Sequence, residues 1–402
     1  MGSTLVITND FPPRQGGIET FVHAMTTRMP AEDLVVYTSH EPGDAAYDAK
    51  LPFPVVRDTA RTLLPTARVT RRAVEVARAH GCDRVWFGAA APLALMAPTL
   101  RRNGVRRIVA TTHGHEIWWA MLPGARRMMR RIGDDVDVVT YLGQYTRSRI
   151  EASLGPRASM SRLVPGVDAE VFQPAAELSV QLSCEPSTGS AGVPAASAAS
   201  AGADVRAQLG LQGKRVILCV ARLVPRKGQD TLIKALPLIQ RTVPEAVLVL
   251  VGQGSHEPRL RKLAQRHGNG SVVFVGGKKH AETPPYYAAA DVFAMPCRTR
   301  KAGLEAEGLG IVFLEAAASG LPVVVGDSGG APDTVLDGRT GHVVDGTDPA
   351  AVARALTATL LDPQVARMGE AGRAWVRDSW SWDASARHLT DLLSPETPLP
   401  TT

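Results

Sequence analysis

The sequence is short of the residues that mark several classes of protein. Its 402 residues include only four cysteines, and no two of them form a C-x-x-C pair. This scarcity argues against a structural zinc site or a disulfide framework and favours a reducing, cytoplasmic environment. No apolar run reaches the ~18 residues of a membrane span, and no signal-peptide pattern opens the chain. We therefore expect a soluble fold that begins at strand-like Leu5 to Ile7.

Two ligand signatures are also missing. Gly252-Gln253-Gly254 follows a strand-like run but lacks the third glycine of the G-x-G-x-x-G fingerprint, which disfavours an NAD enzyme. His113 and His115 are one residue apart and have no evident third partner, so they are weak support for a metal site. No suitable strand end carries a D-x-D signature. We expect neither a metal nor a cofactor.

Length and charge set the scale of the molecule. A chain of this length suggests two domains of about 150 to 200 residues each. The net charge of +6 is unevenly placed, because residues 1–168 hold 22 Lys and Arg against 16 Asp and Glu while the remainder is balanced. A basic N-terminal half predicts an anionic partner, such as a membrane surface, a nucleic acid or a phosphorylated substrate.

Strand-like and helix-like segments alternate through both halves of the chain. The expected strands are 4–8, 34–39, 54–57, 84–87, 108–112, 136–142, 215–223, 246–254, 272–275, 291–296 and 322–326. The clearest helices between them are 18–29 and 229–240. Such alternation predicts the α/β class, with mostly parallel sheets covered by helices on both faces.

Residues 175–203 interrupt this alternation, since they are mostly Ala, Ser, Gly and Pro without periodicity. That composition predicts a flexible interdomain linker. It separates an N-terminal Rossmann-like domain at 1–174 from a C-terminal one at 204–378. We expect a C-terminal helix within 379–402 that packs back on the N-terminal domain.

Residues 61–80 are predicted to form a basic amphipathic helix. Apolar residues share one face, and Arg68, Arg71 and Arg72 crowd the others. Such a helix can lie on an anionic membrane, although an ordinary surface helix has the same pattern. A second basic cluster at 126–131 favours membrane contact. Because aromatic residues are not interleaved with either cluster, nucleic acid is the weaker partner.

The segment E-G-L-G-I-V-F-L-E at 307–315 is the main candidate site. Its glycines indicate a tight loop that leads into a buried helix, and a helix N-terminus offers unpaired amides and a positive dipole to an anion. Glu307 lies in the loop, and Glu315 is expected about two turns into the helix. A structural alternative is a helix with an acidic start and one solvated glutamate.

Other polar residues are expected at the carboxyl ends of strands, where ligands of parallel α/β sheets gather. Asn9, Asp10 and Gly17 follow the first strand, and Gly17 would let a phosphate approach the backbone closely. His113 follows the strand at 108–112. Arg222 and Lys227 follow the first strand of the second half and suit a diphosphate, or they are a solvated basic loop.

Together these motifs resemble the retaining glycosyltransferase family 4, which has the GT-B fold of two doubly wound Rossmann-like domains facing a central cleft. The resemblance spans nearly the whole chain through G-G-I-E (16–19), H-G-H-E (113–116), V-P-G-V-D (164–168), A-R-L-V-P-R-K-G (221–228), V-G-Q-G (251–254) and the E-x(7)-E pair (307–315). Within the family, residues 9–21 and 112–116 resemble GDP-mannose-dependent phosphatidylinositol monomannoside mannosyltransferases. The long insertion at 175–203 departs from the pattern.

The resemblance assigns roles to these residues. Arg222, Lys227 and the amides of Gly308, Leu309, Gly310, Ile311 and Val312 would bind the donor diphosphate, with Gly17 approaching from the other domain. Glu315 would hold the ribose, Glu307 and His113 the transferred sugar, and Gly277 and Lys278 the base. His113, Glu307, Arg222 and Lys227 would thus act in catalysis, without metal, because the cations neutralise the leaving group. Asn9, Asp10, His115, Arg68, Arg71 and Arg72 are expected to bind the acceptor.

The implied reaction transfers mannose from GDP-mannose to an anionic phosphatidylinositol mannoside glycolipid. The enzyme would act as a peripheral protein on the inner face of the plasma membrane. Alternatives are a family-4 transferase that uses a UDP-sugar on another acceptor, an epimerase or hydrolase of nucleotide sugars, and a non-catalytic sensor.

Overall fold

A computed structural model describes residues 2–14, 16–174 and 198–399 of the chain. These residues divide into two compact units. Unit 1 comprises Met1–Gly166 and Trp382–Thr402, and unit 2 comprises Val167–Ser381. The chain therefore enters unit 2 earlier than position 174, where the sequence suggested the first domain would end. The final helix, α16 (Trp382–Leu393), belongs to unit 1.

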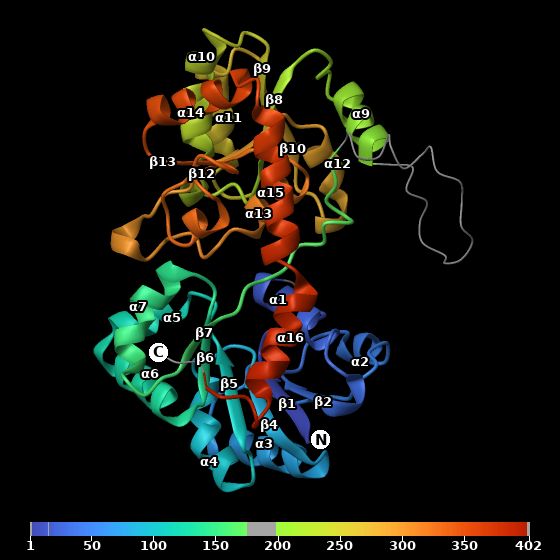
Figure 1. Cartoon of the computed structure of the whole chain (residues 1–402), viewed down its shortest axis with the longest axis vertical. Helices are drawn as coiled ribbons and strands as arrows, with labels where there is room; N and C mark the ends of the chain where they lie inside the picture. The colour runs from blue at the N-terminus through green and yellow to red at the C-terminus, as the bar shows by residue number, and fades with distance from the viewer. Residues whose placement is uncertain (1, 15, 175–197, 400–402) are drawn as a thin grey trace, which may run out of the picture. The chain divides into compact units, whose positions relative to one another are not determined.

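Unit 1 is built on a seven-stranded parallel sheet with the order β3-β2-β1-β4-β5-β6-β7 (Figure 1). Its strands are β1 (Ser3–Thr8), β2 (Leu34–Thr38), β3 (Val55–Arg57), β4 (Cys82–Phe87), β5 (Arg107–Thr111), β6 (Val138–Tyr141) and β7 (Met160–Arg162). The strand order reverses at β1 and β4. Ligands of doubly wound sheets bind at such a reversal, outside the carboxyl ends of the strands.

Helices cover both faces of this sheet because side chains alternate along each strand. Leu5 and Ile7 pack into one core with α3 (Ala67–Ala79), α4 (Ala97–Arg102), α6 (Pro123–Asp135) and α7 (Gln144–Leu154). Val6 points the other way, into a core with α1 (Gly17–Thr26) and α16. Two short helices, α2 (Asp44–Asp48) and α5 (Glu116–Met121), complete the unit.

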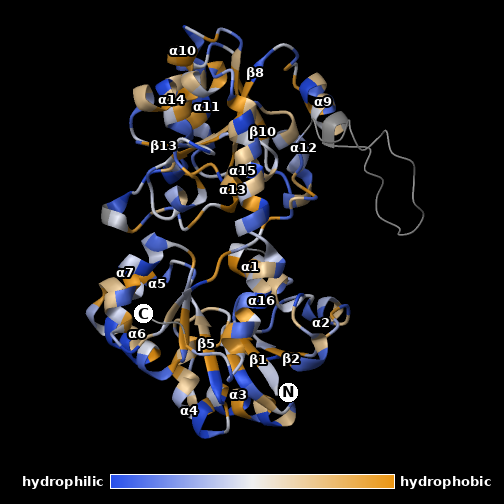
Figure 2. Cartoon of the chain, viewed as in Figure 1, coloured by the Kyte–Doolittle hydropathy of each residue, from blue (hydrophilic) through white to orange (hydrophobic). Residues whose placement is uncertain are grey.

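Unit 2 has a six-stranded parallel sheet with the order β10-β9-β8-β11-β12-β13, which reverses at β8 and β11. Its strands are β8 (Arg215–Val220), β9 (Ala246–Val251), β10 (Val272–Gly276), β11 (Val292–Met295), β12 (Val323–Gly326) and β13 (Gly341–Val344). β9 reads A-V-L-V-L-V and is buried throughout, as expected for a strand covered on both faces. In Figure 2, the labelled strands of unit 1 are likewise coloured mainly as hydrophobic.

The helices of unit 2 pack in pairs around this sheet. They are α9 (Ala198–Gln208), α10 (Gln229–Gln240), α11 (Glu257–His267), α12 (Pro284–Ala288), α13 (Ile311–Ala318), α14 (Pro349–Leu361) and α15 (Val365–Ser379). α10 contacts α14, α13 contacts α15, and α9 contacts α12. The α/β class with two parallel doubly wound sheets, predicted from alternation, is confirmed.

The linker prediction is wrong for residues 198–203, which form the start of α9. Alanine favours the helix, and Gly202 packs closely against Ala288 of α12, so this segment gains tertiary contacts. Residues 175–197 of the predicted linker lie outside the described residues. The basic helix predicted over 61–80 begins only at Ala67, because Pro65 precedes it and the Thr66 side chain caps it by accepting from the Val69 amide.

Candidate active site

The candidate site of unit 2 lies at the carboxyl ends of β8 and β11, where the strand order reverses. The loop after β8 carries Arg222 and Lys227. The loop after β11 carries Glu307 and ends at α13. The fold thus brings the basic loop and the Glu307 loop, far apart in the chain, to the same edge of one sheet.

The two loops meet through an ion pair. Lys227 Nζ lies 2.8 Å from Glu307 Oε2, and the side chains are only 10% and 8% exposed. Arg222 differs, since its side chain is exposed and forms no hydrogen bond or ion pair within the described chain. Its backbone carbonyl is held by Nε2 of buried Gln229 at 3.0 Å. One cation is therefore partnered and buried, and the other is free for a ligand.

A third loop, which we did not predict, supports Glu307. Gly330 N–H donates to the Glu307 carbonyl at 2.8 Å, and Ser328 Oγ accepts from the Glu307 amide at 3.3 Å. A Cβ on Gly329 would lie 1.9 Å from the Glu307 carbonyl oxygen, and this residue has φ +60°. Only glycine fits there. A signal was present, because Asp-Ser-Gly-Gly at 327–330 directly follows the carboxyl end of a predicted strand.

The N-terminus of α13 offers unused amides. The helix begins at Ile311 because Gly310 adopts φ 86°, where a Cβ would also lie 2.4 Å from the Phe313 ring. Within the described chain, the amides of Gly308, Leu309 and Gly310 have no acceptor. The first helical amides likewise lack intrahelical partners. Glu315 is therefore about one turn into the helix, and the expected two turns are wrong because Gly310 stops the helix from starting earlier.

The Glu315 carboxylate is buried, and each of its oxygens accepts a hydrogen bond. His280 Nε2 donates to Oε1 at 2.8 Å, and the Tyr287 hydroxyl donates to Oε2 at 2.7 Å. The hydrogen bond to Glu315 raises the pKa of His280 above its ordinary value. Burial raises the pKa of Tyr287 well above 10, so it donates as a neutral phenol. Neither partner was predicted from the sequence, and nothing in the sequence pattern signalled them.

The residues expected near the base lie after β10. Gly277 and Lys278 are exposed, as is His280 in the same segment. A Cβ on Gly277 would lie 2.8 Å from the Gln253 side chain. Lys278 Nζ is 6.0 Å from the centroid of the Tyr286 ring. Gly277 and Lys278 therefore lie at the same edge of the sheet as Glu315, whose carboxylate accepts from His280 of this segment.

In unit 1, the loop after β1 leads to α1. Asn9 is structural, since its amide exchanges two hydrogen bonds with the Leu63 backbone, at 3.0 and 2.6 Å. Burial, followed by the charge of Glu19, raises the pKa of Asp10 above its ordinary value. A Cβ on Gly17 would meet nothing within 4 Å. The protein itself leaves room for a side chain at Gly17.

His113, after β5, is held as a neutral imidazole. Its Nε2 lies 2.7 Å from the Gly88 carbonyl, which can only accept, so Nε2 carries the proton. Burial lowers the pKa of His113 to about 4. Nδ1 forms no hydrogen bond within the described chain and is left as an acceptor. The Phe21 ring contacts the imidazole edge-to-face at 5.1 Å.

Glu116, to which the sequence assigned no role, holds this loop in place. Its Oε2 accepts from the amides of His113 and Gly114 at 3.0 and 3.1 Å. The side chain is fully buried, and burial raises its pKa above the ordinary value. His115 is exposed and lies 3.3 Å from the other Glu116 oxygen.

The three arginines of α3 differ in their surroundings. Arg68 donates twice to buried Asp58, at 2.8 and 3.0 Å, and this pairing lowers the pKa of Asp58 to about 2. Arg72 pairs with exposed Glu75 at 3.1 Å. Arg71 is exposed and has no partner within the described chain. The structure does not gather Asn9, Arg68 and Arg72 as free ligand groups.

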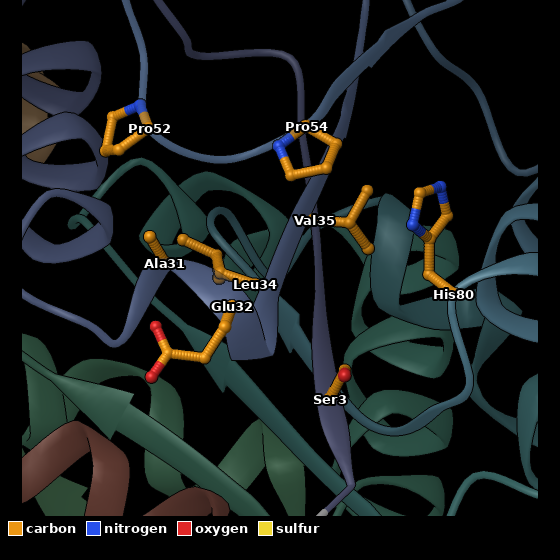
Figure 3. A pocket seen from close by; sticks show the side chains of 8 residues that line it. All are labelled: Ser3, Ala31, Glu32, Leu34, Val35, Pro52, Pro54 and His80. Carbon is orange, nitrogen blue, oxygen red and sulfur yellow. The ribbon is translucent and has the colours of Figure 1, made fainter.

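A pocket of about 450 Å³ in unit 1, shown in Figure 3, lies away from these loops. Ser3 and Leu34, which line it, begin β1 and β2, so the pocket is at the amino edge of the sheet.

Cys82, Cys219 and Cys297 are free and buried, and burial raises the pKa of each thiol to about 12. Among the described residues, no group of three or more His, Cys, Asp or Glu is arranged to hold a metal ion.

Two doubly wound units with such loops at their carboxyl edges are typical of the GT-B fold of glycosyltransferases. Residues 15–171 match the family model "Glycosyltransferase Family 4", and residues 203–375 match "Glycosyl transferases group 1". A solved structure, Anabaena Alr3699/HepE in complex with UDP, has the same fold with a TM-score of 0.75, 19% identity and coverage of 98% of this chain and 99% of its own.

The chain belongs to the family-4 glycosyltransferases, as its relatives show over their full length. The GDP-mannose-dependent alpha-(1-6)-phosphatidylinositol monomannoside mannosyltransferase of Mycolicibacterium smegmatis is 47% identical over 396 residues, which cover 97% of this chain and 98% of that protein. The corresponding enzyme of Corynebacterium glutamicum, named for a monoacylated acceptor, is 43% identical over 397 residues, with 98% of each chain covered. The predicted family and enzyme class are confirmed.

Proposed function

We propose that this protein is a retaining mannosyltransferase that moves mannose from GDP-mannose to a phosphatidylinositol mannoside glycolipid. The observation that carries the proposal is identity of 43–47% over nearly the full length to proteins named for this reaction. The loops of unit 2 support it, because they bring a basic loop and unused amides to the carboxyl edge of one sheet.

Unit 2 would bind the donor. Exposed Arg222 and the unused amides of Gly308 to Gly310 supply positive charge and hydrogen-bond donors for a diphosphate. Lys227 would contact the same diphosphate from its place beside Glu307. Glu307 would then accept from hydroxyls of mannose, and Glu315 from those of ribose. Gly277 and Lys278 would border the base.

The reaction breaks the bond between the anomeric carbon and the β-phosphate oxygen and forms a bond to an acceptor hydroxyl oxygen. On the front-side route, the departing phosphate oxygen takes the acceptor's proton, so that no protein nucleophile is needed. The leaving GDP gains negative charge as the bond breaks. Arg222, Lys227 and the α13 amides would stabilise that charge, typically the largest contribution to such catalysis, without a metal ion.

Unit 1 would bind the sugar and the acceptor. Neutral His113 offers Nδ1 as an acceptor for a sugar hydroxyl, while Gly88 and Glu116 hold its position. At Gly17 the lack of a side chain keeps space open for a ligand beside the α1 amides. Asp10 follows β1 and His115 follows β5, with β4 between these strands, and both side chains would contact the acceptor. None of the described helices is long and apolar enough to cross a bilayer. We propose peripheral contact with the cytoplasmic leaflet.

The test is a donor and acceptor matrix. Purified protein is incubated with GDP-mannose, UDP-glucose or UDP-N-acetylglucosamine, with and without phosphatidylinositol monomannoside, and with or without EDTA. We expect loss of GDP-mannose only with the glycolipid, unaffected by EDTA, and a product with retained α configuration. Preference for a UDP-sugar, or turnover without acceptor, would assign the alternative transferase or the epimerase and hydrolase activities instead.

A further inference from the structure

Large hydrophobic side chains cluster on the surface of α5 and the start of α6. Trp118, Met121, Leu122 and Met128 are 47%, 54%, 57% and 42% exposed. In the part of the chain that the structure describes, they make up half of the exposed large hydrophobic residues. Ile117 and Trp119 of α5 pack on the core of unit 1, so Trp118 and Met121 are left to the opposite side. Three of the four fall within residues 118–122, and an exposed apolar group of this kind marks an interaction site.

Four unpaired arginines adjoin this apolar cluster. Arg126, Arg127, Arg130 and Arg131 of α6 are all exposed, and none forms an ion pair or a side-chain hydrogen bond within the described chain. With Met121 and residues of α7, they line a depression of about 600 Å³. α5, α6 and α7 contact one another and lie side by side in Figure 1. We call the four arginines and four hydrophobic residues the α5–α6 patch.

Nearby acidic groups do little to neutralise the patch. Glu116 at the start of α5 is buried, and Glu151 of α7 pairs with Arg147. Asp134 and Asp135 lie at the far end of α6, where the charge of Arg131 reaches Asp135. Arg68 and Arg72 of α3 differ from these four arginines, because each has a carboxylate partner.

We propose that the α5–α6 patch docks unit 1 on an anionic lipid surface. The arginines would contact lipid phosphates, each contributing about 1 kcal/mol near such a surface. Trp118, Met121 and Leu122 would enter the boundary between head groups and acyl chains. A soluble phosphate ligand would explain the arginines but not the exposed hydrophobic residues beside them. This surface deepens the proposed function, since it rests on a lipid acceptor. Of the two basic clusters that the sequence offers for membrane contact, it selects the one at 126–131.

The experiment measures sedimentation of the full-length protein with phosphatidylcholine vesicles, with and without phosphatidylinositol. One variant changes Arg126, Arg127, Arg130 and Arg131 to Gln, and a second is W118S/L122S. A control removes the same charge from the region of α3 and α4 by changing exposed Arg61, Arg78, Arg102 and Arg106 to Gln. Thermal melting and GDP binding confirm that each variant is folded.

We expect wild-type protein to bind only the anionic vesicles, and both patch variants to bind about tenfold or more weakly. The control should stay within about twofold of wild type. The proposal would be overturned if the control lost as much vesicle binding as the patch variants, or if wild-type protein did not bind anionic vesicles. It would also be overturned if soluble glycerophosphoinositol displaced the protein from vesicles. A patch variant that alters the oligomeric state but keeps vesicle binding would overturn it too, since the surface would then be a protein interface.

Activity separates this proposal from the proposed function. Patch variants should keep near wild-type turnover on a short-chain, water-soluble acceptor and lose it on acceptor embedded in vesicles. If wild-type protein binds vesicles through the patch but does not use GDP-mannose, only the proposed function fails. If wild-type protein and all variants transfer mannose equally well to both acceptors, only the docking surface fails.

Discussion

Lys227 and Glu307 form a buried ion pair, with 2.8 Å between Nζ and Oε2. The pair joins two loops that lie eighty positions apart in the sequence and meet where the strand order of the sheet reverses. Without ligand, the lysine neutralises a carboxylate that would otherwise be buried alone. A bound diphosphate would compete for the same lysine and leave Glu307 to accept from sugar hydroxyls.

Lys227→Ala should therefore harm both stability and catalysis. Removing one partner of a buried ion pair costs about 3–5 kcal/mol, because the remaining charge has no partner. We expect urea unfolding to show a smaller loss for the double variant K227A/E307Q than for K227A alone. Turnover should fall by about 10²–10³ in K227A, the usual effect of removing one group that stabilises developing charge. If the double variant were less stable than K227A, loss of the ion pair would not explain the lower stability of K227A.

Nucleotide binding should weaken as the pH falls through the raised pKa of His280. Protonated His280 holds Glu315 more strongly, and ribose hydroxyls must compete for the same oxygen. Calorimetric titration with GDP at about pH 6 and about pH 9 should show this dependence in wild-type protein. H280A should bind GDP with the same affinity at both pH values. H267A is a matched control on exposed α11, and it should behave like wild type.

G17A should lower turnover without lowering stability. The added methyl group meets no protein atom within 4 Å, so its effect falls on whatever binds beside α1. We expect a loss of about tenfold or more in kcat/KM for GDP-mannose, and an unchanged or slightly raised Tm. G124A is the matched control, because Gly124 also starts a helix and has open space around its Cβ. Full activity in G17A would remove Gly17 from the site.

R68A should destabilise the protein, whereas R71A should not. Asp58 has a side chain only 2% exposed and would lose two hydrogen bonds from Arg68. We expect Tm to fall by roughly 3–6 °C. Because the folded pKa of Asp58 is lowered to about 2 from 3.8, its contribution is present above pH 3.8 and is lost as the pH falls toward 2. The stability of R68A should therefore lack the part of its pH dependence that comes from the Asp58–Arg68 pair. Equal Tm values for the two variants would contradict this.

His113 should make the protein less stable as the pH falls from 6.5 to about 4. Its folded pKa is lowered by burial, so the unfolded chain binds its proton first and stability is lost through that window. H113Q preserves a donor to Gly88 but does not titrate there. We expect its stability to vary less with pH in chemical unfolding between about pH 4 and about pH 7. Turnover by H113Q should fall, because the acceptor at Nδ1 is gone.

Much of the candidate site could be predicted because it lies in loops that follow strands. Gly17, His113, Arg222, Lys227 and Glu307 each follow a strand recognisable from its apolar residues, and parallel strands bring such loops to one edge within each sheet. The partners of these residues could not be predicted. His280 and Tyr287 reach Glu315 only because folding brings the segment after β10 and α12 close to α13, and no local pattern encodes that approach.

The charge pattern alone does not tell which arginines lack a partner. The sequence shows many arginines in residues 1–168 and two basic clusters, at 61–80 and 126–131. Whether an arginine is free depends on carboxylates that come from other elements. Asp58 follows β3 and neutralises Arg68, whereas no described carboxylate reaches Arg126 or Arg127. The difference between α3 and α6 is visible only in the folded chain.

The sequence by itself determined the class of fold, the order of the motifs and the family, because apolar periodicity and glycine positions are local properties of the chain. Tertiary structure decided the chemical state of the side chains. It buried Lys227 against Glu307 and neutralised His113 beside Gly88. Among the residues that the structure describes, it left four arginines of α6 without an ion pair. Burial and the distance to an opposite charge control these states, and both depend on which residues folding brings together.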